Sequence, residues 1–127
     1  MQRIKNEKYI VGGHYSQGII AGDFLFVCGH VAYNPDTGEL VTHDMKEETR
    51  QVLKNIDALA KKAGTSLKNA VKIGTFLTDM KLFPEYNEAY AEFFPDKDES
   101  PTRTTVQVGP LLRDVHIEID AIIYMGD

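Results

Sequence analysis

The chain has 127 residues, of which 43% are hydrophobic and 26% charged, and its formal net charge is -5. This length accommodates one domain with a substantial core but not two. An acidic chain with dispersed lysines lacks the concentrated basic face that binding to nucleic acid requires, so nucleic acid is not an expected partner. No apolar run approaches the ~18 residues of a membrane span, no secretory leader is recognisable, and the single cysteine excludes an internal disulfide. We therefore expect a cytoplasmic protein without a membrane partner.

The first third of the chain predicts a β-hairpin. Ile19 and Ile20 precede a Gly22–Asp23 turn signal, and the β-rich run FLFVCGHVAY follows from 24 to 33. Two such runs separated by a short glycine-containing turn are typical of a hairpin. The next segment, NPDTGEL, has its proline early and its glycine late, which is the chemistry of a tight turn.

Two helices are predicted in the middle of the chain. Asp44 and Glu47, three residues apart, form a capping box, and Glu47 and Glu48 suit the positive end of the helix dipole. Gly64 supplies a left-handed stop after apolar residues at helical spacing, namely Val52, Leu53, Ile56, Leu59, Ala60 and Ala63. The second helix extends roughly from Leu82 to Phe94 and carries Pro84 in its first turn.

Three strands alternate with or follow these helices. They are predicted from Val71 to Thr78, from Arg103 onward, and through VHIEIDAIIYM at 115–125. This order favours a single domain over residues 1–127, with a sheet that carries both helices on one face. The last strand ends in five apolar residues without alternation, which is typical of a strand covered on both sides. Because two helices cover one face only, we expect the other face to meet another subunit.

The alternation in the last two strands predicts which residues face each other. If these strands pair as antiparallel neighbours, Arg103 lies opposite Asp120 and diagonal to Glu118, or directly opposite Glu118 after a two-residue slip. Either register places the guanidinium and the Glu118 carboxylate on one polar face. Such a pair is compatible with a surface ion pair of well under ~1 kcal/mol. The spacing alone favours this interpretation, but it is also compatible with a site in which Arg103 holds a planar anion and Glu118 handles a proton.

Several motifs, in their order and spacing, resemble the RidA (YjgF-like) family. They are YSQG at 15–18, FVCGH at 26–30, NPDTGEL, TRQVLKNIDALAKKAG, FLTDM, YNEAYAEFF, PTRTTVQV and HIEIDAI. The most specific part is the Pro-x-Arg-[ST]-x-Val stretch, with Glu118 fifteen residues after Arg103. The resemblance covers nearly the whole chain.

The resemblance implies an α+β fold of the chorismate-mutase-like (YjgF) type, with a mixed β-sheet, two helices on one face, and a homotrimer around a central barrel. It implies hydrolysis of small imino or enamine acids, such as 2-iminopropanoate and 2-iminobutanoate, to keto acids and ammonia at clefts between subunits, without cofactor or metal. In that picture Arg103 grips the substrate carboxylate and Glu118 is associated with the attacking water. Tyr15 and Asn87 line the cleft.

Four positions depart from the family pattern. Gly13–His14 replaces a glycine-proline pair, and Cys28–Gly29–His30 replaces Ser-Gly-Gln in the binding wall. Thr105 stands where deaminating members often have cysteine, and it can still contact substrate through its backbone. Gln107 replaces an acid. Cys28 and His30 change the size and polarity of the wall, so they bear on substrate range.

Other interpretations remain open at this stage. Cys28 and His30 share a strand face and could form a nucleophilic pair, although no third group is available to orient them. Metal binding is not expected, because His14, His30, His43 and His116 lack ligand spacing. The three candidate functions are an imine deaminase, a binding protein for small acids or partners, and an endoribonuclease or translation inhibitor, which the acidic charge disfavours.

Overall fold

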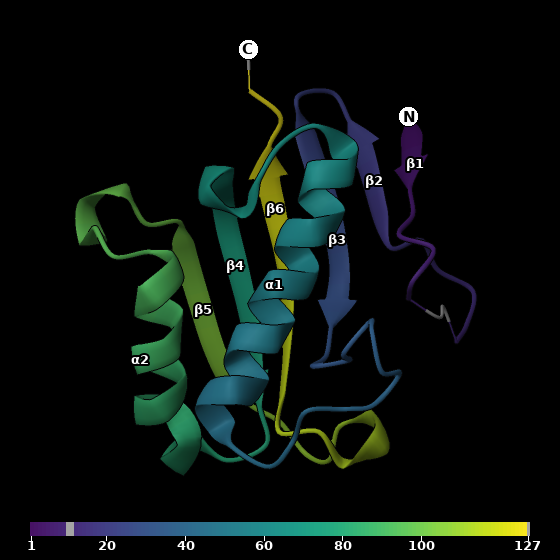
Figure 1. The fold of residues 1–127 in the computed structure, drawn as a ribbon. Helices are drawn as coiled ribbons and strands as arrows, with labels where there is room; N and C mark the ends of the chain where they lie inside the picture. The colour runs from purple at the N-terminus through teal and green to yellow at the C-terminus, as the bar shows by residue number, and fades with distance from the viewer. Residues whose placement is uncertain (10–11, 127) are drawn as a thin grey trace.

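The computed structural model describes residues 1–9 and 12–126, which form one mixed sheet and two α-helices (Figure 1). The strands stand in the order β1-β2-β3-β6-β4-β5 across the sheet. Their bounds are Gln2–Ile4 (β1), Gly18–Ala21 (β2), Phe24–His30 (β3), Ala70–Leu77 (β4), Thr102–Gln107 (β5) and Ile117–Tyr124 (β6). The helices are Met45–Ala63 (α1) and Phe83–Phe93 (α2), and four short 3-10 turns complete the fold at Leu67–Asn69, Met80–Leu82, Lys97–Glu99 and Leu112–Asp114 (η1 to η4). No helix among the described residues is long and apolar enough to cross a membrane.

Both helices begin and end where local chemistry predicts. The Asp44 side chain accepts a hydrogen bond from the Glu47 amide at 2.9 Å, which satisfies one of the free amides at the start of α1. Gly64 ends this helix with a φ of 97°. Pro84 lies in the first turn of α2, where its missing amide hydrogen costs nothing. The prediction of two helices on one face of a mixed sheet is confirmed.

The predicted hairpin is also confirmed. Strand β2 pairs antiparallel with β3, and Gly22 occupies the turn between them with a φ of 62°. The short strand β1 extends this hairpin at the sheet edge by pairing with β2. Sequence patterning did not predict β1, because its three residues are too few to establish alternation.

The predicted pairing of the last two strands is wrong. Strand β5 pairs in parallel with β4, and β6 pairs antiparallel with both β4 and β3. Strand β4 therefore lies between β5 and β6, and β5 is an edge strand. The physical reason is that β4, α2 and β5 form a crossover unit, whose helix packs on the sheet and requires its two strands to be parallel neighbours.

A buried carboxylate fixes the start of β6. Glu48 of α1 has no exposed surface, and its two oxygens accept hydrogen bonds from the His116 amide at 2.7 Å, the His116 ring Nδ1 at 2.7 Å and the Ile117 amide at 3.3 Å. The sequence suggested only a role at the helix dipole for Glu48. Because buried carboxylates need several donors, this arrangement ties α1 to the strand that carries Glu118.

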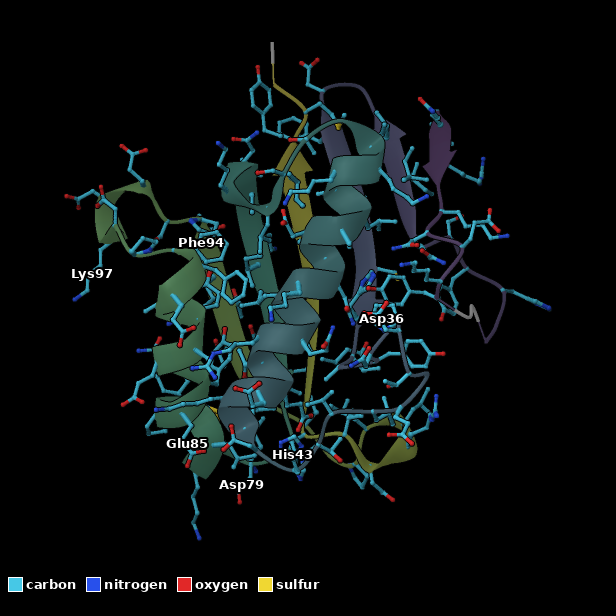
Figure 2. All side chains as sticks on the ribbon, in the orientation of Figure 1. Asp36, His43, Asp79, Glu85, Phe94 and Lys97 are labelled. Atoms are coloured by element: carbon cyan, nitrogen blue, oxygen red, sulfur yellow. The ribbon has the colours of Figure 1, made fainter. Side chains whose placement is uncertain are left out.

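The two faces of the sheet differ sharply. The face under the helices holds the core, which includes Leu25, Ile73, Leu77, Ile117 and Ile119, all of them fully buried. On the opposite face, hereafter the open face, Phe24, Phe26 and Val106 are 37, 46 and 40% exposed. Charged side chains such as Lys97 point outward from the periphery (Figure 2).

Candidate functional site

The first group of predicted site residues gathers between β5 and α2, and we call Arg103, Asn87 and Thr105 the Arg103 half-site. Arg103 pairs with Ile73 of β4, so its side chain lies on the face covered by the helices. Its guanidinium donates a hydrogen bond to Asn87 Oδ1 at 2.9 Å. Among the described residues no carboxylate forms an ion pair with it, so the remaining guanidinium donors are available to an anion.

An aromatic cage holds the Arg103 guanidinium in place. Its Cζ lies 4.5 Å from the ring centroid of Tyr90, 5.4 Å from that of Phe83 and 5.5 Å from that of Tyr86. Stacking on π-faces stabilises a guanidinium and fixes the plane of its fork. The Tyr90 ring is itself buried, and this burial raises the pKa of its hydroxyl. Tyr90 therefore stays neutral while its ring orients the cation.

Thr105 contributes its backbone at the free edge of the sheet. The Val108 amide donates to the Leu77 carbonyl of β4 at 2.8 Å, and the amides of successive residues in a strand point to opposite sides, so residues an odd number of positions from Val108 point away from β4. The Thr105 amide therefore points away from β4, along the same edge as Arg103. The hydroxyl groups of Thr105 and Tyr90 are both buried, and neither has a hydrogen-bond partner. Because this donor belongs to the backbone, it does not depend on the side chain at position 105.

The second group forms the Glu118 half-site, which consists of Tyr15, Cys28, Gly29, His30 and Glu118. Glu118 pairs with Phe76 of β4, and its side chain is half-buried on the open face. Its carboxylate lies against Gly29, where a Cβ would come within 2.1 Å of Oε2. Glycine at this position of β3 thus creates the space that the carboxylate occupies. Burial, with a smaller contribution from the Asp120 charge, raises the pKa of Glu118.

Cys28 and His30 make contact but do not form an activated nucleophile. Cys28 Sγ lies 3.8 Å from His30 Nδ1, and that nitrogen lies 2.8 Å from the Cys28 carbonyl oxygen. Nδ1 therefore carries a proton and donates to the carbonyl, while burial lowers the pKa of the ring. Burial and the Glu118 charge raise the pKa of Cys28 to about 11. The thiol stays protonated near neutral pH, which argues against the nucleophilic pair.

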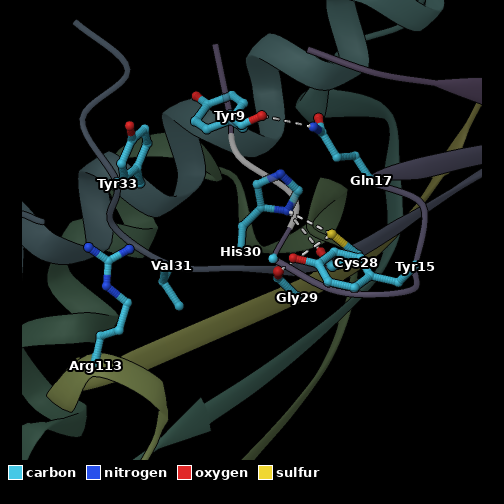
Figure 3. A pocket seen from close by; sticks show the side chains of 10 residues that line it. Tyr9, Tyr15, Gln17, Cys28, Gly29, His30, Val31, Tyr33 and Arg113 are labelled. Carbon is cyan, nitrogen blue, oxygen red and sulfur yellow. Dashed lines mark hydrogen bonds between the residues drawn. The ribbon is translucent and has the colours of Figure 1, made fainter. Parts of the chain in front are cut away.

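These residues border a cavity of about 220 Å³. Its walls are Tyr9, Gly12, Tyr15, Gln17, Cys28, Gly29, His30, Val31, Tyr33 and Arg113 (Figure 3). Glu118 is not itself a wall residue, but its carboxylate lies against Gly29, which is one. Tyr15 is 54% exposed at its mouth. The sequence did not predict Tyr9, Gln17, Tyr33 or Arg113 at this site. Gln17 belongs to the YSQG motif but was given no role, and the other three come from separate segments outside the motifs.

The structure does not bring the two half-sites together within one chain. Arg103 lies on the helix-covered face and Glu118 on the open face, with β4 between their strands. The expectation that they share a polar face is therefore wrong, because it assumed direct pairing of β5 with β6. Within each half-site the predicted residues do gather: Asn87 with Arg103, and Cys28, Gly29 and His30 with Tyr15.

Comparison with known proteins decides the family. A sequence model described as endoribonuclease L-PSP matches residues 7–125. A RutC family protein of Pyrococcus horikoshii is 48% identical over 112 residues, which are 88% of this chain and 87% of the relative. This chain belongs to the RidA (YjgF-like) family.

Two further members of the RidA family relate the fold to chemistry. TdcF of Escherichia coli K12, provisionally named a reactive intermediate deaminase, is 38% identical over 87% of this chain and 85% of its own. A crystal structure of E. coli TdcF with bound serine superposes with a TM-score of 0.90 at 34% identity, covering 99% of this chain and all of that one. RidA of Psychrobacter superposes with a TM-score of 0.89 at 33% identity, covering 98% and 99%. The mixed sheet and two helices are thus those of RidA structures.

Proposed function

We propose that this protein hydrolyses 2-imino acids and their enamine tautomers to 2-keto acids and ammonia. The observation that carries the proposal is the Glu118 carboxyl, which is half-buried, has a raised pKa and lies against Gly29 at the edge of a cavity. A carboxyl group whose pKa is raised toward neutrality is suited to accept and return a proton. The provisional name of TdcF supports the same reaction class.

The Arg103 half-site binds the substrate carboxylate. The guanidinium is fixed by its aromatic cage and retains free donors, so it forms a bidentate pair with a planar carboxylate. The Thr105 amide at the free edge of β5 supplies a further donor. Bound serine in the TdcF structure supports a site that accepts small amino-acid-like molecules.

The Glu118 half-site supplies the proton transfers. Ionised Glu118 takes a proton from water as the water oxygen bonds to C2 of the protonated imine, giving a tetrahedral carbinolamine. Protonated Glu118 then passes this proton to the amino nitrogen, and the C–N bond breaks. As C2 becomes a ketone, the hydroxyl proton passes by way of Glu118 to the departing ammonia, which leaves as ammonium. Glu118 ends ionised again, so the reaction consumes one water and needs no cofactor or metal.

The two half-sites meet between two copies of the chain, in a homotrimer with a central barrel. Support for this comes from their placement on opposite faces of one sheet and from the exposed apolar side chains Phe24, Phe26 and Val106 on the open face. The edge strand β5 is free to approach a neighbouring copy. Light scattering coupled to gel filtration is expected to give about three chain masses.

A coupled assay tests the proposal. An enzyme that generates 2-iminobutanoate in the cuvette is combined with the protein, and release of 2-oxobutanoate is followed against the spontaneous rate. We expect acceleration that survives exhaustive chelation. A spontaneous rate alongside tight binding of 2-oxobutanoate would instead establish a non-catalytic binder of small acids. Cleavage of RNA by the same preparation would establish the endoribonuclease function, which the net charge of -5 disfavours.

A further inference from the structure

The cavity of the Glu118 half-site is larger than a small imino acid needs. Gly29 and Cys28 border it at the end next to the Glu118 carboxylate. Arg113 lies at the other end, beyond His30 and beside Tyr33 (Figure 3). If C2 of the substrate lies at Glu118, its side chain extends into this cavity. A methyl or ethyl side chain would leave most of the roughly 220 Å³ unoccupied.

Most polar groups in the cavity wall already have protein partners. The Tyr9 hydroxyl donates to Asn55 Oδ1 at 2.7 Å. The Gln17 amide group accepts from the Asn6 amide and donates to the Asn6 carbonyl. Burial lowers the pKa of His30, which keeps the ring neutral near neutral pH, and its Nδ1 donates to the Cys28 carbonyl. Arg113 is consequently the one wall residue, among those described, with a permanent charge.

Arg113 itself has no partner among the described residues, neither an ion pair nor a side-chain hydrogen bond. Asp36, the acid of the neighbouring loop, pairs with Lys8 instead, at 3.7 Å. The backbone of Arg113 has a φ of 60°, and Asp114 follows at 58°. Two consecutive non-glycine residues rarely adopt this left-handed conformation, and such conformations concentrate at functional sites. The turn η4 thus presents an unpaired guanidinium to the end of the cavity.

We propose that the space between Tyr9, His30, Tyr33 and Arg113 is a subsite for an acidic substrate side chain, so that 2-imino dicarboxylates are the preferred substrates. This inference rests on the proposed function. One carboxylate of the substrate pairs with Arg103 of the neighbouring copy, and the other pairs with Arg113. A guanidinium at the end of a tyrosine-lined cavity binds a carboxylate bidentately, whereas an alkyl side chain would leave it unpaired.

Turnover of matched imines tests the subsite. A flavin-dependent amino-acid oxidase generates 2-iminosuccinate, 2-iminoglutarate or 2-iminobutanoate, and keto-acid release is compared for the wild type, Arg113→Gln, Arg113→Lys and the control Arg3→Gln. Arg3 is exposed on β1 and does not line the cavity. We expect the wild type to favour a dicarboxylate over 2-iminobutanoate by about tenfold in kcat/KM.

The variants should distinguish the effect of the Arg113 charge from an effect on packing in the cavity. Arg113→Gln is expected to lose about tenfold or more with the dicarboxylates and little with 2-iminobutanoate. Arg113→Lys should recover part of that loss, and Arg3→Gln should lose nothing. A wild type that prefers 2-iminobutanoate, or an Arg113→Gln variant that slows all three imines equally, would overturn the subsite while leaving deamination intact.

A binding measurement keeps the inference testable if no imine is turned over. In that case the proposed deamination fails, and calorimetric titration compares 2-oxoglutarate with 2-oxobutanoate. Tighter binding of 2-oxoglutarate that disappears in Arg113→Gln supports the acidic subsite independently of catalysis. Equal affinities of the two keto acids in the wild type would overturn it.

Discussion

The two half-sites are built by opposite strategies. In the Arg103 half-site a permanent cation is held by three aromatic rings and an amide, and its charge does not depend on the surroundings. In the Glu118 half-site the carboxyl group of Glu118 lies against Gly29, and burial together with the Asp120 charge raises its pKa. The charge of the first half-site is permanent, whereas the charge of the second can change with protonation. This division suits a reaction that needs one group to position the substrate and another to change protonation state.

The difference also separates the effects of substitution. A change in the Arg103 half-site should act on carboxylate binding, with no change in pH dependence. A change in the Glu118 half-site should act on turnover and on its pH profile.

The largest effect is expected from mixing two inactive variants. Arg103→Ala lacks the clamp and Glu118→Gln lacks the base, so neither is expected to turn over imines. If the half-sites meet across subunits, a randomly mixed oligomer of the two should recover about a quarter of the wild-type rate per site. Mixing Arg103→Ala with the double variant Arg103→Ala, Glu118→Gln provides the control, because every site then lacks the clamp. An inactive mixture with confirmed subunit exchange would place the whole site in one chain.

Replacing the planar guanidinium group of Arg103 should produce the next largest effect on activity. Arg103→Lys retains the charge but loses the paired parallel donors, and we expect a loss of ~1.5–3 kcal/mol, or one to two decades in kcat/KM, without unfolding. Titration with 2-oxobutanoate beside thermal melts measures binding and stability separately. Arg3→Lys is the matched control. Unchanged keto-acid affinity in a correctly assembled Arg103→Lys or Arg103→Ala protein would reduce Arg103 to a structural residue.

A smaller effect is expected in the pH profile of Asp120→Asn. The Asp120 charge contributes to the raised pKa of Glu118, after the larger effect of burial. Removing this charge should lower the pKa of Glu118, so the acidic limb of kcat/KM should move to lower pH by less than about one unit. A carboxyl group whose pKa is higher in the folded state than in the unfolded state lowers the free energy of unfolding at pH values above both pKa values. Removing the Asp120 carboxyl should therefore make the protein more stable at neutral pH.

The Asp98→Asn change is the control for that experiment, since Asp98 is exposed in η3 and belongs to neither half-site. An acidic limb that stays at the same pH in Asp120→Asn would show that Glu118 is not the group that titrates.

The smallest effect is expected for Cys28→Ser. The thiol has a pKa of about 11 and is protonated near neutral pH, so turnover should change by less than about twofold. Alkylation of the wild type with a thiol reagent, followed by activity measurement, provides a second probe. Complete loss of activity in Cys28→Ser, with folding retained, would restore the nucleophilic mechanism.

Local chemistry along the sequence determined the elements of this protein. Four local features depend only on residues a few positions apart and can therefore be predicted from the sequence. They are the Asp44 cap, the Gly64 stop, Pro84 in the first turn of α2 and the Gly22 turn. The family motifs likewise singled out Arg103, Asn87, Gly29 and Glu118 as candidate site residues, because motif spacing is a property of the sequence.

Only the tertiary structure decided which strands are neighbours. The sequence places β5 and β6 next to each other in order, but the sheet inserts β4 between them, and Arg103 and Glu118 consequently lie on opposite faces. Glu48 bonding to the start of β6 and Arg113 at the end of the cavity depend equally on contacts between distant segments. Alternation fixes which side chains share a face within one strand, whereas pairing between strands depends on the packing of helices and sheet as a whole.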